Sequence, residues 1–352
     1  MAKNVVLCLD GTGNQIKAKG NTNVVKLYEM LDLSDPSRQV AFYDPGVGTF
    51  SAPGAWTPLS RKFTKVLGLA FGYGIKDNLV EAYTFLIQNY SPGDRVFIFG
   101  FSRGAFTARG LAGMSHRAGL MRPGTENLVP YLVRSYTKGD DWSNDDWEKV
   151  DKFASTFSHE VDGSLSMPIH YLGLWDSVKA LGFLRGDPKW PYTRKLPNAR
   201  TIRHAVSINE RRRPYREYLV HPGDKTDLRE AWFAGVHSDV GGGFKEESHL
   251  LSDITLKWMT DGALDHDLLL WPGAYTKACS RSTEDAAGVV HRMGKIWALL
   301  TYRTRPIAPA DARVHQSVAD RMAAKPEYEI GADLDLIRWE DPDWTTPHAA
   351  AP

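Results

Sequence analysis

A serine between two glycines is the feature of this sequence that points most clearly to chemistry. It is Ser102 in the run Gly100-Phe101-Ser102-Arg103-Gly104, which follows an apolar segment and precedes one rich in Ala, Phe and Leu. A G-x-S-x-G motif between a strand and a helix forms the turn that presents a nucleophilic serine. Gly100 and Gly104 fit because this turn is strained and its neighbours pass close together. The pattern predicts Ser102 as a nucleophile, and a serine that merely caps the helix is the alternative.

A serine is a poor nucleophile unless a base activates it and a further group orients the base. In the order usual for α/β-hydrolases, an acid and then a histidine follow the serine, each just past a strand. Asp176 follows one apolar run and His237 follows another. The sequence therefore predicts Ser102, Asp176 and His237 as a catalytic triad. The alternatives are a helix cap for Asp176 and a structural histidine, tied to Asp239, for His237.

Acyl transfer also requires two N–H donors that stabilise the oxyanion. The residue after the nucleophile supplies one of them, here the Arg103 amide. The second comes from a loop after an earlier strand, and we expect Gly11 or Thr12 because a glycine-rich backbone can approach the substrate. Asp10 and Asp239 are alternatives for the acid and are expected to support the site. Asp239, two residues from the histidine, is better suited to holding its own loop.

Two other functions fit parts of the pattern. A metal-dependent phosphoesterase could use His237, Asp239, Asp10 and Asp44, since carboxylates and imidazole bind Mg²⁺, Mn²⁺ or Zn²⁺, although H-E-x-x-H is absent. A catalytically inactive binding protein on a hydrolase fold could use the run Arg211-Arg212-Arg213 to contact an anionic partner. Nucleotide binding is disfavoured because both phosphate-loop patterns fail. The sequence predicts no cofactor and no metal.

The elements expected around these residues alternate strand and helix, which is typical of a parallel sheet. Strands are expected over residues 5–9, 39–43, 96–99, 169–175 and 230–236. Helices are expected over residues 24–31, 75–86, 105–111, 200–207 and 250–258. Past Pro272 the pattern indicates helices without a clear strand. The predicted fold class is α/β and α/β-hydrolase-like, with a mostly parallel central sheet flanked by helices and a small cap or insertion.

The length of 352 residues permits one large domain or two smaller ones. We expect a single catalytic domain over residues 1–340. Segments 50–74, rich in Gly, Pro and aromatics, and 122–167, acidic and aromatic, are candidates for a cap or lid. A solvated helical hairpin is the alternative for the second segment. Residues 341–352, rich in Pro and Ala, are expected to form a disordered tail.

The amino-acid composition argues against several classes of function. The chain has 43 Lys and Arg and 42 Asp and Glu, a formal net charge of +1, which argues against nucleic-acid binding as its main function. Its two cysteines, Cys8 and Cys279, provide neither a disulfide framework nor a thiolate metal cage. No apolar stretch approaches the roughly 20 residues of a transmembrane segment, and no signal-peptide pattern is present. The sequence predicts a cytoplasmic protein, with signal-independent export as the alternative.

The motifs together resemble a known family. They are Leu9-Asp10-Gly11-Thr12-Gly13-Asn14, Tyr43-Asp44-Pro45-Gly46-Val47-Gly48-Thr49, Gly100-Phe101-Ser102-Arg103-Gly104-Ala105, Leu174-Trp175-Asp176-Ser177-Val178 and Trp232-Phe233-Ala234-Gly235-Val236-His237-Ser238-Asp239-Val240-Gly241-Gly242-Gly243. This set resembles the uncharacterised α/β-hydrolase family that includes the first class of type VI secretion lipase effectors. The resemblance implies a serine esterase or phospholipase fold, with Ser102 as nucleophile, Asp176 as acid and His237 as base. It also implies a small-molecule or lipid ester as substrate.

Overall fold

A parallel β-sheet forms the centre of the molecule. The computed structural model describes residues 2–11, 19–46, 74–139, 142–161, 163–179, 189–221, 223–245, 248–292, 303–309 and 311–351. The strands of the sheet are β1 (Asn4–Leu9), β2 (Gln39–Asp44), β3 (Arg95–Phe101), β6 (Ile169–Trp175), β7 (Ala199–Ser207), β8 (Asp227–Phe233), β9 (Arg313–His315) and β10 (Arg338–Glu340). Their order is β10-β9-β8-β7-β6-β3-β1-β2, and every neighbouring pair is parallel. The predicted α/β class with a mostly parallel sheet is confirmed.

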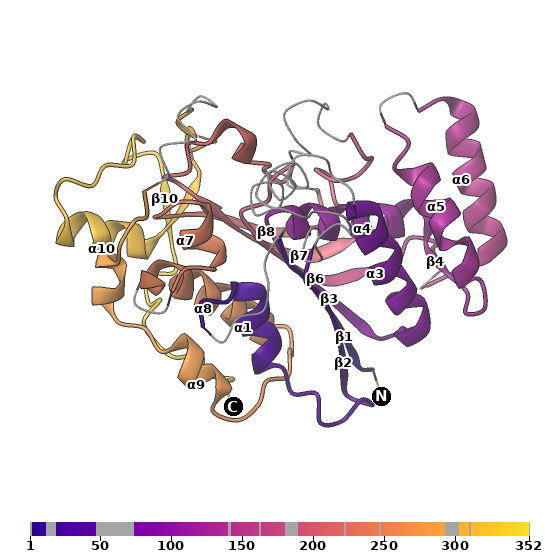
Figure 1. Cartoon of the computed structure of the whole chain (residues 1–352), viewed down its shortest axis with the longest axis horizontal. Helices are drawn as coiled ribbons and strands as arrows, with labels where there is room; N and C mark the ends of the chain where they lie inside the picture. The colour runs from indigo at the N-terminus through magenta and orange to yellow at the C-terminus, as the bar shows by residue number, and fades with distance from the viewer. Residues whose placement is uncertain are drawn as a thin grey trace, which may run out of the picture.

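Helices cover both faces of this sheet (Figure 1). One face carries α3 (Ile75–Asn89), α4 (Arg103–Ala118), α5 (Val129–Tyr136) and α6 (Asn144–Phe157), and the other carries α1 (Asn23–Met30), α8 (Leu250–Leu264) and α9 (Ala274–Cys279). Successive side chains of β1 divide between the two faces: Val5 and Leu7 join the first core, Val6 and Cys8 the second. Strands buried on both faces have continuous apolar sequences, which explains why most of them were predictable.

The strand order reverses beside β1, and site residues lie at this point. The chain runs from β1 through α1 to β2 on one side of β1, and then returns through α3 to β3 on the other side. In such sheets, loops diverge at the carboxyl ends of the two strands where the order reverses, and ligands bind there. Asp10 follows β1 and Ser102 follows β3, so both lie at this point.

The segment 200–207 is a strand, β7, and the prediction of a helix there is wrong. Its side chains are nearly all buried because β7 lies between β6 and β8, so the alternation expected of a half-buried strand is absent. The β-branched residues Thr201, Ile202 and Val206 favour a strand, and pairing on both sides decides the outcome.

Two further expectations near the C-terminus are corrected. Strands β9 and β10 extend the sheet, although each has three residues, too few for a periodic pattern to be detected. We expected a disordered tail after residue 340, but the described residues there pack onto the domain. Trp344 is buried, and its Nε1 donates a hydrogen bond to Asp320 at 2.7 Å.

The two cap candidates have different outcomes. Residues 47–73 lie outside the described part of the chain, and so does nearly all of segment 50–74. Segment 122–167 contains α5 and α6, which pack outside α3 and α4, as Figure 1 shows. It is a helical hairpin, and its movement as a lid stays a prediction. Within the described ranges no helix is long and apolar enough to span a membrane.

Candidate active site

Ser102 occupies a strained turn between β3 and α4. Its φ of 60° and ψ of −119° lie outside the usual regions for a residue with a side chain, and its amide donates to the Trp175 carbonyl at 3.0 Å. A Cβ on Gly104 would lie 2.1 Å from the Leu9 carbonyl oxygen. A Cβ on Gly100 would lie 2.7 Å from Cα of Ala105. Both glycines are therefore required by close backbone approach, as the sequence pattern predicted.

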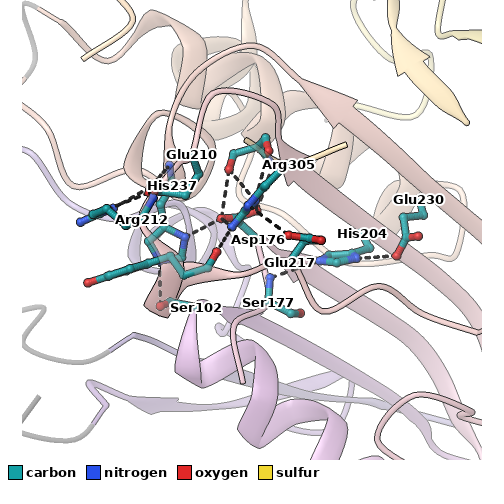
Figure 2. A network of polar contacts seen from close by, with 12 residues as sticks. Ser102, Asp176, Ser177, His204, Glu210, Arg212, Glu217, Glu230, His237 and Arg305 are labelled. Atoms are coloured by element: carbon teal, nitrogen blue, oxygen red, sulfur yellow. Dashed lines mark hydrogen bonds and ion pairs between the residues drawn. The ribbon is translucent and has the colours of Figure 1, made fainter. Parts of the chain in front are cut away.

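The structure brings the three predicted triad residues together (Figure 2). His237, the first residue of α7 (His237–Gly241), places Nε2 at 2.8 Å from Oγ of Ser102. Its Nδ1 lies 2.6 Å from Oδ2 of Asp176. All three side chains are at least nine-tenths buried. Strand β8 ends at Phe233, three residues earlier than expected, so His237 begins α7 and does not directly follow the strand.

Asp176 directly follows β6 and also has strained backbone geometry, with a φ of 39°. Its amide donates to the Ala205 carbonyl at 2.7 Å. Its carboxylate accepts hydrogen bonds from the amide and hydroxyl of Ser207, at 2.9 and 3.2 Å. The carboxylate thus has fixed partners, and it is not a helix cap.

Arg305 is a partner of Asp176 that sequence reasoning missed. Its Nη1 lies 2.6 Å from Oδ1 and its Nη2 3.2 Å from Oδ2 of Asp176, which makes a two-pronged ion pair. Burial alone would raise the pKa of Asp176, but Arg305 and His237 outweigh burial and hold that pKa below its ordinary value. Asp176 is therefore ionised at neutral pH.

His237 is neutral at neutral pH for a different reason. Burial lowers its pKa below the ordinary value of 6.5, while Asp176 and Glu210 oppose the shift. The Phe101 ring lies 4.6 Å from the imidazole, and the Tyr215 ring packs edge-on at 4.8 Å, both measured between centroids. These rings exclude water and fix the orientation of the imidazole. A neutral, oriented imidazole bonded to a hydroxyl can act as a general base.

A second carboxylate–guanidinium pair lies beside His237, and the sequence analysis did not predict it. Glu210 is fully buried and accepts a hydrogen bond from the His237 amide at 3.2 Å. Arg212 donates its Nε and Nη2 to Glu210 at 2.9 and 2.7 Å. The pair thus contacts the backbone of His237 and leaves the imidazole to Asp176. The sequence analysis placed Arg212 in an arginine run that could contact an anionic partner, and did not predict its ion pair with Glu210.

The loop after Asp176 is fixed by His204, which lies on β7. The Ser177 amide donates to Nε2 of His204 at 3.2 Å. Nδ1 of His204 must then carry the proton, and it donates to Glu230 at 2.7 Å. His204 lies on a strand and not in the helix expected over residues 200–207, and both of its ring nitrogens are occupied by structural hydrogen bonds.

The predicted oxyanion donors have unequal support. Arg103 directly follows Ser102 and is the first residue of α4. The Gly11 amide donates to Oδ1 of Asp10 at 2.6 Å, so it is engaged in this structure. Thr12 lies outside the described residues. The Arg103 amide stays the proposed donor, and the second donor stays a prediction.

The predicted supporting acids hold loops. Asp10 accepts hydrogen bonds from the hydroxyls of Thr22 and Tyr43. Asp239 accepts from the Val236 amide at 2.9 Å, and its Oδ1 lies 2.6 Å from Nδ1 of His291. It is His291, and not His237, that is tied to Asp239. In the part of the chain that the structure describes, no three His, Cys, Asp or Glu side chains gather as a metal site.

The fold and this site define a protein of the α/β-hydrolase class, with a serine at a strand-to-helix turn. The chain belongs to the family described as "T6SS, Phospholipase effector Tle1-like, catalytic domain", which matches residues 3–262. The family resemblance carried by the motifs is thereby confirmed. This membership supports hydrolysis of the lipase and esterase type.

Individual relatives add context. An uncharacterized protein, YEL023C of Saccharomyces cerevisiae, is 36% identical over 229 residues, which are 62% of this chain and 33% of the relative. The chain thus spans about a third of the length of that curated relative. Among solved structures, an uncharacterized protein from Pseudomonas aeruginosa is 18% identical, with a TM-score of 0.44, and covers 88% of this chain and 57% of its own. The Tle1 effector bound to the VgrG spike of the Type 6 secretion system is 20% identical, with a TM-score of 0.37, and covers 69% of this chain and 51% of its own.

Proposed function

We propose that the protein is a serine hydrolase that cleaves carboxylic esters through an acyl-enzyme intermediate, with Ser102 as nucleophile, His237 as base and Asp176 as acid. The observation that carries the proposal is the hydrogen-bonded series from Ser102 Oγ through both nitrogens of His237 to Asp176. Family membership supports the same reaction class.

The first half of the reaction acylates the serine. Oγ of Ser102 bonds to the ester carbonyl carbon while its proton moves to Nε2 of His237, and the carbonyl oxygen becomes an oxyanion. Asp176 accepts the Nδ1 proton in a hydrogen bond, so the correct tautomer is held and the imidazolium is stabilised. The tetrahedral intermediate then collapses, its bond to the leaving alcohol breaks, and His237 returns the proton to that alcohol.

The second half releases the acid. Water attacks the acyl-Ser102 carbonyl carbon as His237 accepts one of its protons. The bond from Oγ to the acyl group breaks, His237 protonates Oγ, and the carboxylic acid leaves. The partial positive charge at the start of α4 lies beside the developing oxyanion and supports both steps.

A lipid ester is the substrate class we favour, because the family description names a phospholipase effector. A panel of phospholipids and soluble esters that differ in acyl length tests this choice. Cleavage limited to short soluble esters would contradict it.

Labelling with a fluorophosphonate probe tests the mechanism directly, because the probe phosphonylates an activated serine. We expect one adduct, located at Ser102 by peptide mass spectrometry, and no adduct in a His237→Ala variant. Chelator treatment should leave the labelling unchanged. An adduct elsewhere, or none on the folded protein, would contradict the serine mechanism, and loss of ester or phosphoester cleavage in the chelator would favour the metal-dependent alternative.

The pH dependence of kcat/KM follows from the environment of His237. The base must be neutral, and burial lowers its pKa, so activity should persist to lower pH than an exposed histidine would allow. With a neutral ester we expect the acid limb to have its midpoint below pH 6.5, the ordinary value for histidine. A midpoint above that value would mean that the carboxylates outweigh burial.

A further inference from the structure

The Asp176 carboxylate is saturated with hydrogen-bond partners. His237, the amide and hydroxyl of Ser207, and the two terminal nitrogens of Arg305 make five contacts with its two oxygens. An ionised carboxylate offers about four lone-pair sites, so it cannot rotate without losing partners. Its orientation toward His237 is therefore set by groups outside the three predicted triad residues.

Arg305 is itself held in place on several sides. Its Nη1 also donates to the carbonyl and hydroxyl of Ser207, at 3.1 and 2.7 Å, and its Nη2 donates to the Tyr215 carbonyl. Its Nε lies 3.8 Å from Glu217, and both residues are labelled in Figure 2. The Arg305 side chain is buried. A buried guanidinium is costly unless it is paired, and its planar fork matches a carboxylate in a way that lysine cannot.

We propose that Arg305 is a positioning residue, which holds the Asp176 carboxylate in line with Nδ1 of His237. This inference rests on the proposed function. The backbone of Asp176 has a strained φ, and a strained residue keeps its conformation only when several surrounding contacts hold it there. The hydrogen bonds from Arg305 are among these contacts. Arg305 lies beyond the segment that matches the family, so the family motifs do not point to it.

Arg305 also changes the charge around the base. Among the described residues, the charged side chains that contact His237 or its direct partners are the carboxylates of Asp176 and Glu210 and the guanidiniums of Arg305 and Arg212. Removing Arg305 would leave an excess of negative charge, which favours the protonated imidazole. A neutral replacement should therefore move the titration of His237 to higher pH. A lysine keeps the charge and loses the two-pronged geometry.

The experiment compares Arg305→Met, Arg305→Lys and the wild type by the rate of fluorophosphonate labelling between pH 5 and pH 9. We expect Arg305→Met to label on the order of 100-fold more slowly. Its acid limb should lie about one pH unit higher than that of the wild type. Arg305→Lys should label about 10-fold more slowly, with its acid limb unmoved. NMR titration of the His237 ring should show the same shift in Arg305→Met.

Arg203→Met is the matched control. Arg203 is a buried arginine on β7 that pairs with Asp265 at 3.5 Å and donates to the Trp258 carbonyl, away from the site. This control should lose stability while its labelling rate and acid limb stay those of the wild type. Wild-type labelling by either Arg305 variant would overturn the inference, and Arg305→Lys decides it if Arg305→Met does not fold. A wild type that does not label would overturn the proposed function instead, while the His237 titration still tests Arg305.

Discussion

Replacing Ser102 with alanine should lower kcat for ester cleavage by about 10⁶-fold, the loss typical when a serine hydrolase loses its nucleophile. Oγ of Ser102 is the atom that lies 2.8 Å from Nε2 of His237, so the substitution removes the proposed attacking group. The substitution removes one oxygen and keeps the Cβ, so the strained turn and both glycine contacts remain. We expect the thermal unfolding temperature to stay close to that of the wild type.

Ser115→Ala is the matched control for this variant. Ser115 lies on the same helix, α4, and is fully buried, and its hydroxyl has no hydrogen-bond partner among the residues that the structure describes. The control should keep wild-type kcat on the same ester panel. If Ser102→Ala retained more than a small fraction of the activity, with the protein folded, the acyl-enzyme mechanism at Ser102 would be wrong.

Replacing Asp176 with asparagine should damage both catalysis and stability. Asparagine cannot hold the required tautomer of His237, and a comparable change in another serine hydrolase lowers kcat by about 10⁴-fold. It also removes the carboxylate charge that pairs with the two terminal nitrogens of the buried Arg305, and breaking a buried ion pair typically costs about 3–5 kcal/mol. Steady-state kinetics and urea unfolding measure the two effects separately.

Two comparisons sharpen this prediction. Asp151→Asn makes the same substitution in the exposed ion pair with Arg117, and neither kcat nor the free energy of unfolding should change appreciably. Glu210→Gln tests the other carboxylate near the base. If Glu210→Gln lowered kcat more than Asp176→Asn did, Glu210 would be the orienting acid, contrary to the contacts that place it on the His237 backbone.

The three proposed catalytic residues could be found from the sequence because each follows a buried strand. Strands β3 and β6 have largely apolar sequences, and β8 ends in the buried apolar residues Ala231, Trp232 and Phe233. Parallel strands bring their carboxyl ends to the same edge of the sheet. Residues at the ends of such runs are therefore predicted to be neighbours, even when they are far apart in the chain. The order of serine, acid and histidine added a second, independent constraint.

The groups that support them could not be found in this way. Arg305 and Glu210 occur in polar stretches, where an arginine or a glutamate is most simply explained as a solvated side chain. Their partners lie 129 and 27 positions away, and only the assembled sheet brings them together. Strand β7 was missed for a related reason, since burial on both faces removes the alternation that separates a strand from a helix.

The active site forms late in folding, because the parallel sheet that brings its residues together depends on contacts between distant parts of the chain. The side chain of Asn4 bonds to the carbonyl of residue 267, and the side chain of Gln39 to that of residue 269, so distant parts of the chain close on each other. Contacts of such long sequence separation form slowly, and they form late. Ser102, Asp176, His237 and Arg305 come from segments spread over most of the chain. A partly folded molecule would therefore contain helices and single strand pairs without a reactive serine, and recovery of that reactivity would mark the completion of the whole sheet.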